Sequence, residues 1–310
     1  MTLQSEIVNA RRTLEQAGID PSEAAVDADL LARAVLGWDR ARLLASLGDP
    51  APPAFHEPYA GLIARRQRRE PAAYIVGYRE FWSRQFEVGP SVLVPRPETE
   101  LIVEEALADL TGRPAPPSPL RGFGALGASF SRSSPARHPL HIADVGTGSG
   151  CLAVTLALEL PLARVVATDT SRRALEIARR NAARHEVADR VDFVSTDLLA
   201  EVDARFDLIV SNPPYIPASE MPQLPPEVRE YEPPEALSGG PDGLDVIRRL
   251  LLQAESRLKD HGVLIFEFGF AEDRAVSQAI AARPAFRLEK IRSDLQGIPR
   301  TAVARWQPPR

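Results

Sequence analysis

From residue 141 onward, short apolar runs alternate with amphipathic segments, and this alternation constrains the fold more than any other feature. The expected strands are 141–145, 164–168, 191–195, 207–211 and 263–268, and the expected helices are 150–160, 171–185, 245–258 and 271–282. Two last strands, 286–291 and 301–306, flank a turn at 297–299 and predict a closing antiparallel pair. Such a pattern predicts an α/β, Rossmann-like doubly wound sheet that binds ligands at the carboxyl ends of its strands.

The residues before this region follow a different pattern. Residues 1–94 predict a small helical domain, because apolar residues recur at helical spacing, and this domain should end in a short hairpin. Residues 95–110 form a connecting segment with an amphipathic helix. Pro, Gly, Ser, Ala and Arg dominate 111–139, which predicts a flexible insertion, and the α/β domain then spans 140–310.

An arginine cluster at Arg65, Arg66, Arg68 and Arg69 ends one expected helix. It is either a solvated helix end that complements the helix dipole or a patch that contacts an acidic or nucleic-acid partner. The net charge of −5 weighs against a stable nucleic-acid partner for the whole chain.

Composition excludes several kinds of site. The single cysteine, Cys151, and the five scattered histidines offer no metal-ligand spacing, so no metal is expected. The first residues lack a basic region followed by an apolar run, and the strongest apolar stretch, 151–160, is too short to span a bilayer. We therefore expect a cytoplasmic protein without membrane association.

The first strand runs into a glycine loop, Gly146-Thr147-Gly148-Ser149-Gly150. Its G-x-G-x-G spacing differs from the G-x-G-x-x-G fingerprint of dinucleotide sites, where a pyrophosphate sits on the helix N-terminus. The loop suits a ligand without phosphates, such as the methionine end of S-adenosylmethionine. Asp144, at the end of the strand, is expected to bind the ammonium group of that ligand directly or through water.

Acidic residues follow the next two strands. Asp169 lies about 20 residues beyond the glycines, where a carboxylate can bond both ribose hydroxyls. Asp197 is placed to accept a hydrogen bond from the adenine amino group, and Leu198 to pack on the ring. Three consecutive strands thus end in groups that bind adenosine, which predicts an S-adenosylmethionine site.

The fourth strand leads into Asn212-Pro213-Pro214-Tyr215. The prolines make this loop rigid, the Asn212 side-chain oxygen and the Pro213 carbonyl can accept the two N–H groups of an NH₂, and Tyr215 can lie on a planar face. Two fixed acceptors can orient a poorly nucleophilic amide or amino nitrogen toward a sulfonium methyl, so a strong base is unnecessary. The motif predicts methylation of a planar nitrogen.

The motif alone does not choose among adenine, cytosine or guanine amino groups and a glutamine amide. A DNA or RNA amino-methyltransferase of the adenine N6 type is the main alternative, and it would need a basic groove and a pocket for a flipped base. Two alternatives are weaker. The G-x-G-x-G spacing disfavours a nucleotide-dependent oxidoreductase, and the intact Asn212 to Tyr215 motif disfavours a non-catalytic cofactor-binding module.

Further segments extend the pattern over nearly the whole chain and in the same order as in one family. They are 70–77, 80–82, 93–100, the glycine loop, 211–216, 231–233 and 239–245. In these segments the chain resembles the HemK/PrmC family of peptide chain release factor glutamine methyltransferases. The sequence departs from the family pattern at two places. The segment 111–139 is longer than expected, and position 198 is leucine where some members carry an aromatic residue.

The resemblance implies a class I S-adenosylmethionine-dependent methyltransferase domain preceded by a helical substrate-recognition domain. The substrate would be the glutamine of the Gly-Gly-Gln motif in release factors, whose methylation supports translation termination. Asn212, Pro213, Pro214 and Tyr215 would hold that glutamine. The cofactor site would comprise Gly146, Thr147, Gly148, Ser149, Gly150, Asp169, Asp197, Leu198 and Asn212. Glu98 and Thr99 would lie near the mouth of the site or tie the domains together.

Overall fold

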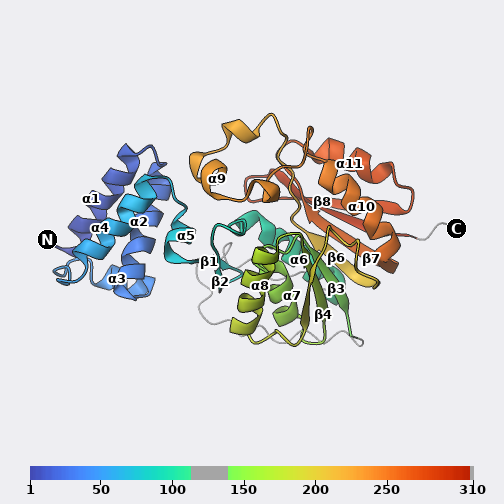
Figure 1. The fold of residues 1–310 in the computed structure, drawn as a ribbon, viewed down its shortest axis with the longest axis horizontal. Coiled ribbons are helices and arrows are strands. Elements are labelled where there is room, and N and C mark those ends of the chain that lie inside the picture. The colour runs from blue at the N-terminus through green and yellow to red at the C-terminus, as the bar shows by residue number, and fades with distance from the viewer. Residues whose placement is uncertain (113–138, 308–310) are drawn as a thin grey trace. The chain divides into compact units, whose positions relative to one another are not determined.

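The computed structural model describes residues 1–112 and 139–307, and Figure 1 shows its ribbon. The chain forms two compact units: Met1–Tyr78 with Leu224–Tyr231, and Arg79–Gln223 with Glu232–Arg310. We call them the helical unit and the sheet unit. The expected insertion, 111–139, lies outside the described residues except for residues 111, 112 and 139.

The helical unit is built from helices of 5 to 16 residues, and side chains cap the first three of them. They are α1 (Leu3–Gln16), α2 (Pro21–Leu36), α3 (Arg40–Ala45), α4 (His56–Gln67), α5 (Ala72–Val76) and α9 (Pro226–Tyr231). The Asp20 side chain accepts from the backbone N–H groups of Ser22 and Glu23 at the start of α2, and Gly37 ends that helix in the left-handed conformation. The helical character expected for the N-terminal region is confirmed, whereas α3, α5 and α9 were not anticipated.

Two arginines of the cluster at the end of α4, Arg66 and Arg69, bind acids of this unit, whereas Arg68 is exposed. Arg66 is only 1% exposed and its guanidinium lies 2.6 Å from Asp27, 2.7 Å from Glu23 and 3.6 Å from Glu227. Arg69 also donates to Glu227, at 3.0 Å from Nε. The interpretation as a solvated helix end is wrong for these two arginines, because the acids that they bind belong to the same unit.

The sheet unit contains the expected doubly wound sheet with strand order β5-β4-β3-β6-β7-β9-β8. The first five strands in this order are parallel, and β9 is antiparallel to both of its neighbours. The strands are β3 (His141–Val145), β4 (Arg164–Asp169), β5 (Val191–Ser195), β6 (Phe206–Ser211), β7 (Leu258–Glu267), β8 (Phe286–Ser293) and β9 (Pro299–Trp306). The expected strands and the closing antiparallel pair are confirmed.

Helices cover both faces of this sheet, as Figure 1 shows with α7 and α8 on one face and α10 and α11 on the other. They are α6 (Glu100–Thr111), α7 (Cys151–Glu159), α8 (Arg172–Arg184), α10 (Asp245–Arg257) and α11 (Asp273–Ala281). Side chains alternate along each strand, so Leu208 and Val210 join the core beneath α6 and α7, while Ile209 joins the core beneath α10. Among the described residues, no helix is both long and apolar enough to cross a bilayer.

The hairpin of β1 (Tyr78–Phe81) and β2 (Arg84–Glu87) forms as expected, but almost all of it belongs to the sheet unit. Phe81, Trp82 and Phe86 are buried in the same core cluster as the strands β3 and β6. The expected domain boundary at residue 94 therefore differs from the division after Tyr78, since the aromatic residues of the hairpin pack against the sheet.

Candidate active site

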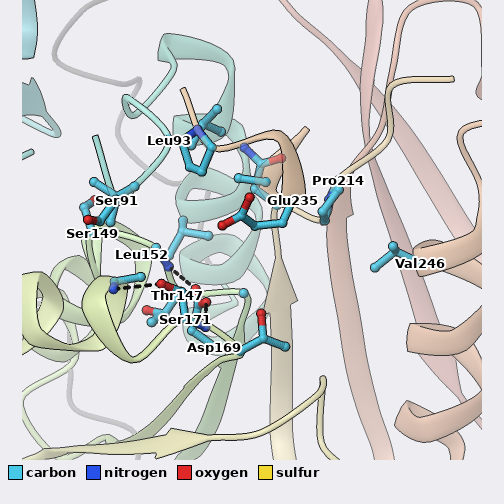
Figure 2. Close-up of a pocket in the computed structure, with 18 of the residues that line it drawn as sticks. Ser91, Leu93, Thr147, Ser149, Leu152, Asp169, Ser171, Pro214, Glu235 and Val246 are labelled. Atoms are coloured by element: carbon cyan, nitrogen blue, oxygen red, sulfur yellow. Dashed lines mark hydrogen bonds between the residues drawn. The ribbon is translucent and has the colours of Figure 1, made fainter. Parts of the chain in front are cut away.

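A cavity of about 260 Å³ lies at the carboxyl ends of the parallel strands in the sheet unit. Its walls come from the loops after β3, β4, β5 and β6, the segment before α6, residues 233–236 and the start of α10 (Figure 2). Of the residues expected at a site, the cavity brings together Gly146, Thr147, Gly148, Ser149, Asp169, Asp197, Leu198, Asn212 and Pro214. Gly150, Pro213 and Tyr215 are outside its described lining.

The three glycines of the loop after β3 serve two purposes. Gly146 and Gly148 have φ angles of 73° and 53°, and a Cβ added to either would meet nothing within 4 Å. They allow the backbone conformation and leave space above the loop. Gly150 differs, because its Cβ would lie 3.0 Å from the Cβ of Ala178 on α8, so this glycine lets α7 and α8 pack closely.

Asp144 supports this loop from below. Its side chain is fully buried, and its Oδ2 accepts from the Thr147 hydroxyl at 2.6 Å and from the Ala153 backbone N–H at 3.0 Å. Burial raises the pKa of Asp144 to about 7. The carboxylate is turned into the loop and lies outside the described lining of the cavity, so its expected contact with a ligand ammonium group, direct or through water, stays a prediction.

The two later acids occupy different environments. Asp169 lines the cavity and accepts from the backbone N–H groups of Gly148 at 2.9 Å and Ser171 at 2.8 Å, while burial raises its pKa. Asp197 also lines the cavity, but its side chain is about half exposed and forms an ion pair with Arg249 of α10. Leu198, beside it, has a φ of 53°, which is uncommon for a residue with a side chain.

Asn212 and Tyr215 are joined to one buried carboxylate behind the cavity wall. The Asn212 Nδ2 donates to the Thr99 hydroxyl at 3.0 Å, and that hydroxyl donates to Glu267 Oε2 at 2.7 Å. The Tyr215 hydroxyl donates to the other oxygen of Glu267 at 3.0 Å. Burial raises the pKa of Glu267 to about 7, and burial together with Glu267 raises the pKa of Tyr215, so the phenol remains a donor.

Two further contacts fix the segments around the motif. The Glu232 carboxylate is buried and accepts a hydrogen bond from Arg96 at 2.6 Å. This bond joins the segment before α6 to the segment that continues into residues 233–236. Gly239 and Gly243 lie so close to Tyr215 that an added Cβ would come within 2.7 Å of its backbone. The glycines after the motif therefore allow two chain segments to touch.

Comparison with known proteins identifies the family. Family models match at residues 7–77, described as the PrmC N-terminal domain, and at 122–223, described as a methyltransferase small domain. The release factor glutamine methyltransferase of Bradyrhizobium diazoefficiens is 40% identical over 98% of this chain and 96% of its own length. That of Cereibacter sphaeroides is 41% identical over 94% of each chain. The chain belongs to the release factor glutamine methyltransferase family.

The fold agrees with this membership of the family. The catalytic domain of hMettl16, solved in complex with MAT2A 3′UTR hairpin 6, is similar with a TM-score of 0.53 and 16% identity over 79% of this chain and 81% of that chain. At that identity the likeness concerns the fold alone, which is the class I S-adenosylmethionine-dependent methyltransferase fold expected from the sequence.

S-adenosyl-L-methionine is the cofactor of this methyltransferase fold, and the residues of the cavity fit it. The space above Gly146 and Gly148 would hold the methionine part, and Asp169, at the end of β4, would accept from ribose hydroxyls. The acids Asp169, Asp197 and Glu235 outnumber the one lining arginine, Arg249, which pairs with Asp197, and this balance suits a cationic sulfonium. Among the described residues, no group of three or more His, Cys, Asp and Glu side chains could hold a metal ion.

Sequence reasoning missed Glu267, Arg249 and Glu235. Glu267 ends β7 just as Asp144 and Asp169 lie at the ends of β3 and β4, so the rule that chemistry follows each strand was a sufficient signal for it. Arg249 and Glu235 had no comparable signal, because they approach the cavity from a helix face and a loop.

Proposed function

We propose that this chain transfers a methyl group from S-adenosyl-L-methionine to the side-chain amide nitrogen of the glutamine in the Gly-Gly-Gln motif of peptide chain release factors, and so supports translation termination. The family to which the chain belongs supports this substrate. The structural observation that carries the proposal is the amide of Asn212, which lines the cofactor cavity and is held at Nδ2 by Thr99.

The chemistry assigned to the chain is recognition and orientation. When bound, the cofactor supplies a methyl group on a positively charged sulfonium. Asn212 Oδ1 and the Pro213 carbonyl accept the two N–H groups of the glutamine amide and direct its nitrogen to that methyl, while Tyr215 packs on the amide plane. The nitrogen forms its new bond to carbon as the carbon–sulfur bond breaks, and it then releases one proton to solvent. Fixed acceptors of this kind supply orientation and charge stabilisation without a strong base.

The alternative is methylation of an amino group in DNA or RNA. The net charge of −5 disfavours it, because proteins that hold nucleic acid neutralise phosphates with a basic surface. The buried Arg66 and the partly exposed Arg69 also bind acids of their own unit. These observations support a protein substrate over a nucleic-acid substrate, and we propose that the reaction takes place in the cytoplasm without a stable nucleic-acid partner or a membrane partner.

A transfer assay tests the proposal directly. The purified chain and methyl-labelled S-adenosylmethionine are incubated with a release factor, with its variant in which the motif glutamine is alanine, and with DNA and RNA. Label should enter the release factor alone, at the glutamine. Label in nucleic acid, or equal label in the alanine variant, would overturn the substrate assignment.

The Asn212→Ala variant tests the assigned role of the motif. It should bind cofactor within about tenfold of the unmodified chain, measured by calorimetry. Turnover should fall by roughly 10²- to 10³-fold, because one of two oriented acceptors is lost. Asn9→Ala, a substitution of the same type at an exposed position of α1, is the matched control and should change neither quantity. Unchanged turnover in Asn212→Ala would contradict the role.

A further inference from the structure

A line of hydrogen bonds with a fixed direction runs from Glu267 to the motif. Glu267, Thr99 and Asn212 come from the end of β7, the turn before α6 and the loop after β6, respectively. Glu267 is 1% exposed and Thr99 is 2% exposed, so their groups exchange few hydrogen bonds with water. Moving a carboxylate out of water costs free energy, so we expect Glu267 to have a role other than packing.

The direction follows from which groups can donate. A carboxylate only accepts, so whenever Glu267 is ionised the Thr99 hydroxyl donates its proton to Glu267, as the contact between Oγ1 and Oε2 indicates. The Thr99 oxygen is then left as an acceptor, and the Asn212 group that faces it must be the donor, Nδ2. The two ends of an asparagine amide have nearly the same shape, so polarity and not packing decides which end faces Thr99.

The orientation of Asn212 decides what it can bind. With Nδ2 against Thr99, the opposite end of the amide presents Oδ1, an acceptor. A rotated amide would present an NH₂ group to the NH₂ group of the substrate, and two donors would face each other without an acceptor.

We propose that Glu267 is a positioning residue that acts through Thr99 to hold Asn212 with its acceptor toward the substrate amide, and that it holds the Tyr215 phenol with its other oxygen. This inference rests on the proposed function and assigns a further residue to it. Glu267 does not act as a base on the substrate, because both of its oxygens accept hydrogen bonds and it is not part of the described cavity wall.

The two variants Thr99→Val and Thr99→Ser separate the hydroxyl from the shape of the side chain. Thr99→Val keeps the shape and removes the hydroxyl, so Asn212 loses its directing partner. Its kcat for release factor methylation should fall roughly 10- to 100-fold. Thr99→Ser keeps the hydroxyl and should remain within about threefold of the unmodified chain. Calorimetry with S-adenosylhomocysteine should give dissociation constants within about threefold for both, which shows that both are folded.

A double substitution shows whether the effect passes through Asn212. In the Asn212→Ala background, Thr99→Val should cause no further loss of kcat, because the group to be oriented is gone. A full additional loss would overturn the proposal, as would an unmodified kcat in Thr99→Val alone. If the unmodified chain fails to methylate the release factor, the proposed function fails instead, so the two failures are distinguishable.

Discussion

The ends of β3 and β7 both carry a fully buried carboxylate whose pKa burial raises to about 7, yet the two acids are used differently. Asp144 accepts both of its hydrogen bonds on Oδ2, and the donors lie three and nine residues further along the chain. Glu267 uses one oxygen for Thr99, 168 residues away, and the other for Tyr215, 52 residues away. The first acid shapes its own loop, and the second connects three distant segments.

The property that the two acids share should produce the largest effect, which is on stability. Each carboxyl has a folded pKa above its unfolded value, so its stabilising protonated form is fully present below the unfolded pKa and is lost as pH rises toward 7. Neutral Asp144→Asn and Glu267→Gln avoid this loss. Urea unfolding should show each variant gaining on the order of 2–3 kcal/mol relative to the unmodified chain between pH 5 and pH 8. A difference that does not change with pH would refute the raised pKa at that position.

The second largest effect is on turnover. It comes from the difference between the two acids, because Asp144 accepts its hydrogen bonds on one oxygen and Glu267 uses both. Asp144→Asn can place its Oδ1 where Oδ2 was, so it should keep both hydrogen bonds and a kcat within about threefold. Glu267→Gln can accept at one oxygen only, and its NH₂ group then faces either Thr99 or Tyr215. Its kcat should fall roughly 10- to 100-fold. Release factor methylation under saturating cofactor measures both, and equal effects would remove the contrast between the two acids.

The smallest effect concerns the dependence of turnover on pH. Thr99 and Tyr215 donate to Glu267, Glu98 raises its pKa and Arg300 lowers it, although burial is the largest cause of the shift. Protonated Glu267 is no longer an obligatory acceptor, so kcat should fall by up to about tenfold in total between pH 7 and pH 5. Glu267→Gln should lack this decline between pH 5 and pH 7. If the decline persists there and disappears in Asp144→Asn, the titrating group is Asp144.

The same contrast explains what the sequence could predict. The sheet, the glycine loop and the placement of Asp169 follow from patterns within about 30 consecutive residues, and the structure contains all three. The orientation of the Asp144 side chain could not be predicted, because a strand end alone does not show whether a side chain faces the cavity or the loop beneath it. The pairing of Thr99 with Glu267 depends on how the segment before α6 crosses the end of β7, which no local pattern encodes.

The partners of the arginine cluster and of the hairpin could not be predicted, for a related reason. The sequence left open whether the arginines are solvated or contact a partner, because the acids that bury Arg66 are distant in sequence, and one of them, Glu227, lies in the other half of the chain. The hairpin was predicted as an element, whereas its assignment to a unit depends on which core receives Phe81 and Phe86. Helices and strands can be predicted from neighbouring residues, whereas the residues against which they pack are distant in sequence and cannot.

The placement of α9 in the helical unit has a consequence for how this architecture can be divided. Leu224–Tyr231 leaves the stretch of chain that follows the Asn212 motif, contributes Glu227 to Arg66 and Arg69, and returns. The helical unit is therefore discontinuous, and a fragment cut after Tyr78 would carry a buried arginine without one of its acids. A chimera that exchanges the helical unit between relatives would have to transplant both pieces together, because the second piece lies within the part of the sequence that forms the sheet unit.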